Sequence, residues 1–438
     1  MRIGLINFNK KGVREPGIPP VPPIGLEYLA DDLEEDNHEV ALLDLCFVDA
    51  ADRRDAIHSF VQDKELIGIT FRNFGVDSLW LGDDQFYAPQ LKTVVKEVKE
   101  AKNVPVVLGG QGFSIYPQKT LEYVGADFGV YGPGERALRT LAANLGNYSR
   151  GSVLQQPANL EITHKRHLIN YAKYFAEGGA ANIATKFGCP FRCNYCVEQR
   201  RVLQRRSMDR VFAELKCLLD LGAKFVFVAE PEFNNHLQHC LSFCRGILER
   251  SLKFEWTGYL YPIPMTEELV RLMKTSGCVN PCVSVVSGDD GVLRALDNAF
   301  TVKDLRRIAE WFHKYDFPFT VDLLFGGPGE TVETARRTIA LMEEMRPAVV
   351  GMNIGVRIYA GTGFAKRLQA GHFETRGKIY GYTEGNDDLF LPAYYISDMA
   401  VRDYLMEVCD SDSLYRLFGY SGFGGVNYVA ARKPALAA

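Results

Sequence analysis

The chain has 438 residues, of which 47% are apolar and 24% charged, and its formal net charge is −4. A single hydrophobic core stops growing at roughly 250–300 residues, so we expect two or three domains. A near-neutral balance lacks the basic surface that binds polyanions, so nucleic acid is not an expected partner. The apolar run at residues 1–7 is too short for a signal peptide, and no stretch predicts a membrane-spanning helix. We therefore expect a cytoplasmic protein with no membrane partner, whose ten cysteines remain thiols or bind metal.

The first 150 residues alternate between short apolar strands and amphipathic helices. Strands are predicted at residues 2–7, 40–45, 66–71 and 104–108, and helices at 25–35, 50–62, 89–101, 117–124 and 135–145. This alternation predicts a parallel, doubly wound sheet of the Rossmann-like α/β class. Ligands of such sheets bind at the carboxyl ends of the strands, where this chain carries Arg72 and Gly109-Gly110. Residues 151–180 are mixed polar and small, and we interpret them as a linker.

A second series of strands and helices begins at residue 181. After a first strand near residue 183, strands are predicted at 225–228, 256–259, 283–286, 319–325 and 350–358, and helices at 209–221 and around 240, 270, 308 and 338. Six such units over residues 181–362 predict an open, partial TIM-type barrel with its chemistry at the carboxyl ends of the strands. Residues 363–438 are rich in tyrosine, and we expect them to form a small cap over the barrel mouth.

The first loop of this second series contains three closely spaced cysteines, Cys189, Cys193 and Cys196. Cysteine thiolates are the usual ligands of iron–sulfur clusters. Three cysteines leave one iron of a four-iron cluster without a protein ligand, and that iron can chelate the amine and carboxylate of a small molecule. A structural zinc site is the alternative, but it needs a fourth ligand from elsewhere, such as Cys217. A disulfide with a spare thiol does not suit the expected reducing compartment.

The CxxxCxxC spacing, the aromatic Tyr195 and the position after a strand resemble the radical S-adenosylmethionine (SAM) superfamily. The resemblance implies a 4Fe–4S cluster on the three cysteines, and reductive cleavage of SAM with electrons from a protein such as flavodoxin or ferredoxin. It also implies that Tyr195 contacts the adenine of SAM. Later strand ends extend the match and supply further cofactor-binding candidates: Glu232, Ser284, Ser287, Gly326, Gly327, Glu330 and Arg357. The two serines are candidates for the ribose because Val286 stands where family members often carry glutamate.

Residues 1–150 resemble the cobalamin-binding domain that precedes many radical SAM cores, with matches at residues 22–30, 108–114 and 132–135. The resemblance implies that cobalamin lies near Arg72, Gly109 and Gly110, where glycine lets the backbone approach a flat ligand. The cobalt-ligating histidine motif of methionine-synthase-type domains is absent, and no histidine occurs between residues 63 and 163. Arg72 is cationic and cannot ligate cobalt. The alternative is that this domain is only a scaffold.

Together the resemblances imply a class B radical SAM methyltransferase that methylates an unactivated carbon of a small-molecule substrate. One rival is cobalamin-independent transfer of the 3-amino-3-carboxypropyl group of SAM to a soft acceptor such as arsenic. The cysteine pairs Cys240/Cys244 and Cys278/Cys282 would then form a thiophilic site, although buried packing is the default for such thiols. Other rivals are a cobalamin-dependent radical rearrangement or dehydrogenation, and a carrier protein without enzyme activity.

Overall fold

The structure is a computed structural model that describes residues 1–8, 19–75, 86–161, 164–198, 202–382 and 384–418. The chain divides into two compact units. The first comprises Met1–Val76, Asp84–Gly179 and Ala213–Gly222, and the second comprises Asp77–Asp83, Ala180–Phe212 and Ala223–Ala438. No helix in the described part of the chain has the length and apolarity needed to cross a bilayer.

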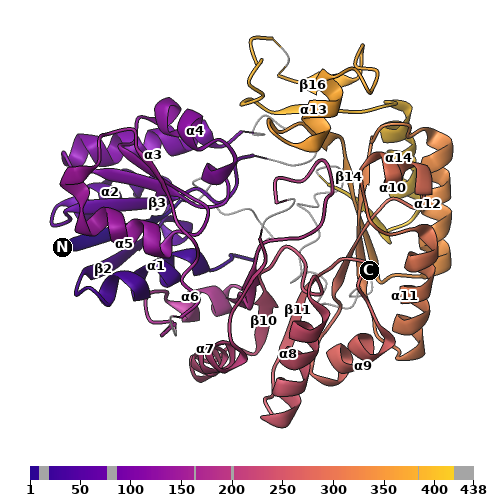
Figure 1. Ribbon diagram of the computed structural model, residues 1–438, viewed down its shortest axis with the longest axis horizontal. Helices are drawn as coiled ribbons and strands as arrows, with labels where there is room; N and C mark the ends of the chain where they lie inside the picture. The colour runs from indigo at the N-terminus through magenta and orange to yellow at the C-terminus, as the bar shows by residue number, and fades with distance from the viewer. Residues whose placement is uncertain (9–18, 76–85, 162–163, 199–201, 383, 419–438) are drawn as a thin grey trace. The chain divides into compact units, whose positions relative to one another are not determined.

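The first unit is built on a six-stranded parallel sheet with the strand order β2-β1-β3-β4-β5-β6. Its strands are β1 (Arg2–Asn7), β2 (Glu39–Asp44), β3 (Leu66–Thr70), β4 (Val106–Gly109), β5 (Phe128–Tyr131) and β6 (Val153–Gln155). Its helices are α1 (Ile24–Glu34), α2 (Arg53–Val61), α3 (Ala88–Ala101), α4 (Pro117–Val124), α5 (Glu135–Ala143) and α6 (Tyr171–Ala176). Helices α1 and α5 cover one face of the sheet and α2, α3 and α4 the other (Figure 1). The predicted doubly wound sheet is confirmed.

Two strands of this sheet were not predicted. β5 has only four residues and contains Gly129, and β6 has only three. Such short segments carry too little periodic signal to be separated from loops. Their backbone pairs in parallel with β4 and with each other, so the sheet extends two strands beyond the predicted four.

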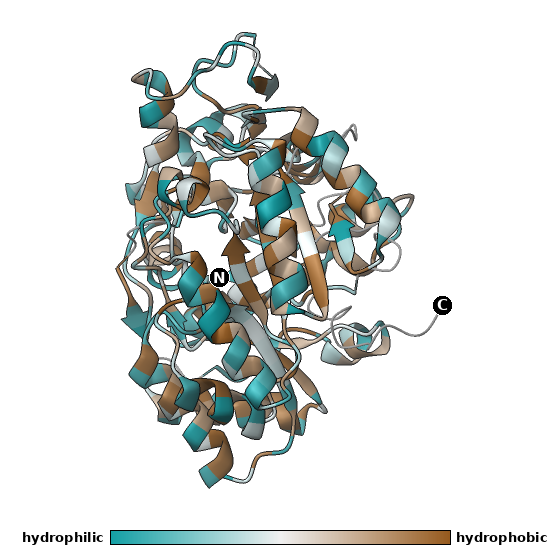
Figure 2. Ribbon diagram, turned by 90° about the vertical axis from the view of Figure 1, so that its right-hand side faces the viewer, coloured by the Kyte–Doolittle hydropathy of each residue, from teal (hydrophilic) through white to brown (hydrophobic). Residues whose placement is uncertain are grey.

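The second unit is built on a seven-stranded parallel sheet with the order β18-β14-β13-β12-β11-β10-β7. Its strands are β7 (Ala181–Ile183), β10 (Phe225–Val228), β11 (Glu255–Leu260), β12 (Cys282–Val286), β13 (Thr320–Phe325), β14 (Val349–Ile354) and β18 (Tyr415–Leu417). Helices α8 (Leu237–Glu249), α9 (Glu267–Thr275), α11 (Val302–Lys314) and α12 (Val332–Met345) lie along the outer side of the sheet (Figure 1). Figure 2 shows that helices on this side of the molecule carry both hydrophilic and hydrophobic residues, as expected where one helix face is buried.

The end of the sixth predicted strand differs from expectation. Gly355 has a φ of 90° and divides the segment into β14 and the short β15 (Val356–Arg357). β15 joins an antiparallel sheet with β17 (Ala393–Tyr395) and β16 (Ile379–Gly381). Helix α14 (Ala400–Ser411) then leads to β18, which pairs with β14 and forms the edge of the parallel sheet. The C-terminal part predicted as a cap therefore also completes the parallel sheet, and its residues 419–438 lie outside the described residues.

Candidate functional site

The three-cysteine loop belongs to the second unit and connects two short paired strands. β8 (Lys186–Phe187) precedes the loop and β9 (Gln204–Arg205) follows it, and the two strands pair in antiparallel fashion. Asn194 anchors the loop from within, because its backbone N–H donates to Leu296 O (3.1 Å) and its carbonyl accepts from Phe364 N (2.8 Å). The backbone N–H of Cys196 donates to Cys193 O (3.1 Å), which gives the loop a tight turn.

The sulfur atoms of the loop lie in a mostly buried, polar environment. Cys189 and Cys193 are buried, and Cys196 is half-buried. Cys193 Sγ lies 3.6 Å from Tyr261 Oη and 3.4 Å from Asn298 Oδ1, and Cys196 Sγ accepts from Glu198 N (3.4 Å). Burial raises the pKa of Cys189 to about 11 and that of Cys196 to about 12. Each thiol must therefore release a proton when it ligates a metal.

Three thiolates in one loop suit a cluster better than a single zinc ion. A structural zinc site needs four ligands, whereas a cluster places each of three thiolates on a separate iron. Among the described residues, the one group of three ligating side chains with ligand atoms within 4.8 Å of one another is Asp31, Glu34 and His167, in the first unit.

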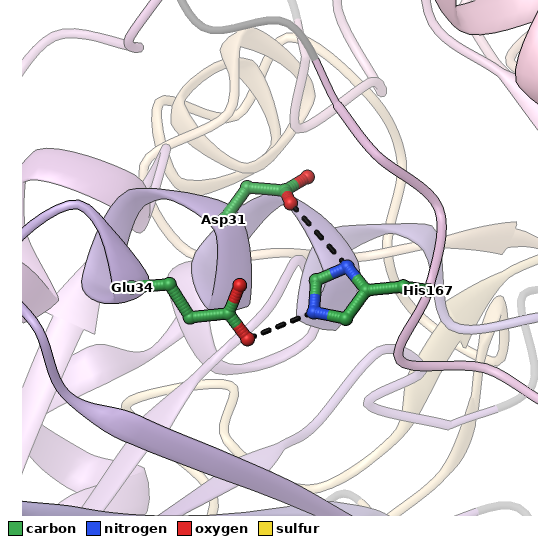
Figure 3. A group of neighbouring side chains, drawn as sticks. All are labelled: Asp31, Glu34 and His167. Atoms are coloured by element: carbon green, nitrogen blue, oxygen red, sulfur yellow. Dashed lines mark hydrogen bonds and ion pairs between the residues drawn. The ribbon is translucent and has the colours of Figure 1, made fainter.

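Figure 3 shows the Asp31, Glu34 and His167 group. His167 lies between two acids of helix α1, with Nδ1 3.6 Å from Asp31 Oδ1 and Nε2 2.8 Å from Glu34 Oε1. Both ring nitrogens therefore face carboxylates, which is the arrangement of an ion-pair bridge between α1 and residues 164–167. We assign no metal to it.

Three of the sequence-predicted candidates lie together near the cysteines. Ser284 Oγ on β12 donates to Glu232 Oε1 (2.9 Å), and the second carboxyl oxygen of Glu232 is buried without a hydrogen-bond partner. Burial raises the pKa of Cys193, and the nearby charge of Glu232 raises it further. Burial, followed by the charges of Cys193 and Cys196, raises the pKa of Tyr195, and the charge of Glu232 adds a smaller effect. Burial also raises the pKa of Glu232 to about 8. Glu232, with its partner Ser284, thus lies near the cysteine loop that contains Tyr195, and its orphaned carboxyl oxygen fits a hydrogen-bond donor of a bound cofactor.

Ser287 lies apart from this group. Its hydroxyl accepts from Asp289 N (3.2 Å) and is 3.4 Å from Thr338 Oγ1 on helix α12. Val286, the last residue of β12, has a φ of 64°, which is unusual for a β-branched residue, and the pairing of β12 with β13 shifts register between Ser284 and Val286. Ser287 is fully buried, and its hydroxyl is used in packing between strand and helix. Of the two serines predicted to bind the ribose, only Ser284 lies beside Glu232.

Gly326, Gly327 and Glu330 form one closed turn after β13. Glu330 Oε2 accepts from Gly326 N (2.5 Å) and Gly327 N (3.2 Å), while its Oε1 is buried without a partner. Burial raises the pKa of Glu330 to about 8. Thr331 caps helix α12 by accepting from Thr334 N (3.3 Å), which sets where the turn ends. Glu330 thus stabilises the turn and keeps one oxygen for a ligand.

Arg357 lies on β15, at the antiparallel sheet. It is buried, its guanidinium donates to Tyr394 Oη (3.3 Å), and it lies over the rings of Tyr394 (5.4 Å) and Tyr359 (4.9 Å). The two tyrosines hold the guanidinium in one orientation. A role in cofactor binding remains a prediction for this residue.

In the first unit, the predicted residues lie at the carboxyl ends of β3 and β4. Arg72 is exposed directly after β3. A Cβ at Gly110 would lie 2.8 Å from Phe71 O, and one at Gly112 would lie 2.7 Å from Phe74 N. Close packing of the two loops therefore explains these glycines without a ligand. The exposed Arg72 and the backbone of Gly109-Gly110 still border the edge at which such sheets bind ligands.

Sequence reasoning missed two polar pairs in the second unit, one buried and one half-buried. Lys186 contacts Glu230, both side chains are fully buried, and Lys186 Nζ also donates to Phe233 O (2.7 Å). Half-buried Asn353 donates through Nδ2 to Asp322 Oδ1 (2.8 Å) on the neighbouring strand. A signal was present in both cases, because Asp322 interrupts an apolar strand and Glu230 lies two residues after one.

The two further cysteine pairs behave as core residues. Cys240, Cys244, Cys278 and Cys282 are all buried, and burial raises the pKa of each thiol. Cys240 Sγ donates to Phe233 O (2.7 Å). None of the four belongs to a group of three metal-ligating side chains within the described part of the chain. Buried thiols acting as small apolar residues account for them.

Comparison with known proteins agrees with this geometry. The family model described as "B12 binding domain" matches residues 19–142, and the model of the "Radical SAM superfamily" matches residues 183–342. Tryptophan 2-C-methyltransferase of Streptomyces laurentii is 26% identical over 80% of this chain and 72% of that protein.

Solved structures share the fold over nearly the whole chain. The radical SAM methyltransferase TsrM from Kitasatospora setae, with tryptophan and a SAM analogue bound, has a TM-score of 0.83 and 23% identity, over 96% of this chain and 91% of that one. The cobalamin-dependent radical enzyme OxsB has a TM-score of 0.70 and 15% identity, over 94% and 67%. The sequence motifs, the cysteine loop and both family matches agree: this chain is a radical SAM enzyme with an N-terminal B12-binding domain.

Proposed function

We propose that this enzyme uses a 4Fe–4S cluster, SAM and cobalamin to transfer a methyl group to a carbon atom of a small aromatic molecule that resembles tryptophan. The observation that carries this proposal is the order of parts in one chain. A B12-binding domain precedes a radical SAM core, and the match to tryptophan 2-C-methyltransferase extends across both. Because the similarity to this methyltransferase extends across both domains, it favours methyl transfer over reactions that need only the radical SAM core.

The domain organisation belongs to this proposal. Residues 1–150 hold cobalamin, and residues 151–180, first interpreted as a linker, contribute β6 and α6 to the first unit before the core begins. Residues 181–362 bind the cluster and SAM, and 363–438 form the C-terminal cap. Cobalamin serves as methyl carrier and the cluster as a one-electron centre when they are bound. A reductant such as flavodoxin or ferredoxin supplies the electrons.

Named residues of the second unit would hold the cofactors. Cys189, Cys193 and Cys196 ligate the cluster through thiolates, and their fixed loop leaves one iron for the amino and carboxyl groups of SAM. The free oxygens of Glu232 and Glu330 accept hydrogen bonds from SAM, and Ser284 orients Glu232. Tyr195 lies beside the cluster cysteines and packs against the adenine.

In the first unit, Arg72 would lie near bound cobalamin, and its cationic side chain could not supply a ligand to cobalt. The described loops at the carboxyl ends of β3, β4 and β5 carry no histidine either. Gly109 and Gly110 approach the cofactor through their backbone.

The test is a single anaerobic reaction of the reconstituted chain with cobalamin, a reductant, tryptophan and SAM labelled in its methyl group. We expect labelled methyltryptophan and S-adenosylhomocysteine, and cob(II)alamin whose electron paramagnetic resonance shows no nitrogen coupling. Methylthioadenosine as the main product would instead indicate aminocarboxypropyl transfer. Turnover of SAM without bound cobalamin would reduce the first unit to a scaffold. An Arg72→His variant is the matched control, because it offers the missing imidazole at the same position.

A further inference from the structure

A row of polar side chains crosses the inside of the second unit, and part of it has no role in the proposed function. Asp322 lies in the middle of β13 and is in register with Ser284 on β12. Asn353 on β14 donates to Asp322 (2.8 Å), and Ser284 donates to Glu232 (2.9 Å). We call Glu232, Ser284, Asp322 and Asn353 the interior carboxyl row.

The row contains two acids and no cation. No ion pair joins Glu232 or Asp322 to a basic side chain of the described residues. The nearby Lys186 is bound to Glu230 and to the carbonyl oxygen of Phe233 instead. Among the described residues, neither Glu232 nor Asp322 therefore has a basic partner in an ion pair, although buried carboxylates are normally paired. The charge of Lys186 acts on Glu232 and favours its ionised form, but Lys186 is itself paired with Glu230.

The arrangement also leaves hydrogen-bonding capacity unused. The second carboxyl oxygen of Glu232 is fully buried and has no partner. Burial, together with the charge of Asp322, raises the pKa of Glu232 to about 8, and burial raises the pKa of Asp322 to about 7. A cation placed between them would stabilise both ionised carboxylates and use the free oxygen.

We propose that the interior carboxyl row binds an organic cation, either a protonated amine or a sulfonium group, and that Asp322 supplies the charge that selects it. The inference rests on the proposed function for its setting, because SAM and an amino-acid acceptor both carry such a cation. It adds a binding residue that neither the sequence motifs nor the comparisons assign.

Binding to the cluster-reconstituted full chain, measured anaerobically by equilibrium dialysis, tests the proposal with two pairs of probes. SAM is compared with S-adenosylhomocysteine, which lacks the sulfonium charge, and tryptamine with indole-3-propionate, which lacks the ammonium. For Asp322→Asn we expect the Kd of one cationic probe to rise about tenfold to hundredfold, with the Kd of its counterpart nearly unchanged. The affected pair identifies the source of the cation.

Glu310→Gln, which removes an exposed acid of α11, is the control and should change none of the four Kd values.

The affinities of the unmodified protein for the four probes are a second readout, which does not depend on the folding of a variant. In at least one pair of probes, the unmodified protein should bind the cationic member more tightly than the member without that charge. Equal binding within both pairs, or an Asp322→Asn variant that weakens cation and counterpart alike, would overturn the inference. If methylated product forms but the protein binds both members of each pair equally, only the cation site is refuted. If the protein prefers the cationic probe but binds no cobalamin, only the proposed function is refuted.

Discussion

The buried pair Lys186–Glu230 allows a quantitative test of how the cysteine loop is supported. Lys186 lies three residues before Cys189, and both side chains of the pair are fully buried. The other oxygen of Glu230 accepts from Thr185 N (2.7 Å) and Thr185 Oγ1 (2.6 Å). Lys186→Met removes the charge and retains the apolar stem, so the carboxylate of Glu230 loses its only cation among the described residues.

Removal of one partner from a buried ion pair costs about 3–5 kcal/mol, because the remaining charge is left uncompensated. We expect the lower end of this range for Lys186→Met, since two hydrogen bonds from Thr185 still stabilise Glu230. The double variant Lys186→Met/Glu230→Gln removes both charges. It should be less destabilised than the sum of the single variants, because neither charge is left alone.

Equilibrium unfolding in urea, followed by tryptophan fluorescence in a Trp80→Phe/Trp311→Phe background that leaves Trp256 as the single reporter, measures these free energies. Trp256 is fully buried in the second unit and its ring lies 5.0 Å from that of Phe233, whose carbonyl oxygen accepts from Lys186. Lys314→Met, which breaks an exposed pair with Glu267, is the control and should have no resolvable effect. A loss below about 1 kcal/mol for Lys186→Met, or strictly additive effects in the double variant, would show that the pair does not support the loop as argued.

Three further outcomes follow from the structure. Replacement of all three loop cysteines by alanine should abolish cluster absorbance and SAM cleavage, and four irons per chain in that variant would exclude the assigned ligands. The raised pKa values of Glu232 (about 8) and Asp322 (about 7) mean that the folded chain keeps protons that the unfolded chain releases, so these acids stabilise the fold less as the pH rises toward 8. Glu232→Gln should therefore gain thermal stability relative to the unmodified protein between about pH 5.5 and pH 8, and a pH-independent difference would contradict this. Gly112→Ala should cost about 1–3 kcal/mol, because its Cβ would lie 2.7 Å from Phe74 N, whereas Gly25→Ala has open space and should be neutral in the same thermal unfolding measurement.

Much of this protein could be predicted from the sequence because the relevant signals are local. Apolar periodicity is set by neighbouring residues, so most strands and helices of both sheets were predicted within a few residues. The cysteine loop is also local, since three ligands within eight residues specify a cluster site before any folding is considered. The short strands β5 and β6 were missed because β5 depends on pairing with β4, and β6 on pairing with β5, rather than on their own pattern.

Contacts between distant segments were decided only by the tertiary structure. Ser284 and Ser287 are equivalent as sequence candidates, but Ser284 donates to Glu232, whereas Ser287, beyond the register shift and positive φ at Val286, packs against Thr338 of α12. Asp322 and Asn353 are 31 residues apart and meet only because β13 and β14 pair in register. The glycine-rich turn at residues 109–112 suggested ligand contact. A Cβ placed at Gly110 or Gly112 would instead come closest to the backbone of residues 71–74. The sequence determined which side chains carry the chemistry, and the packing of strands determined which of them meet, because long-range pairing leaves no periodic trace in either segment alone.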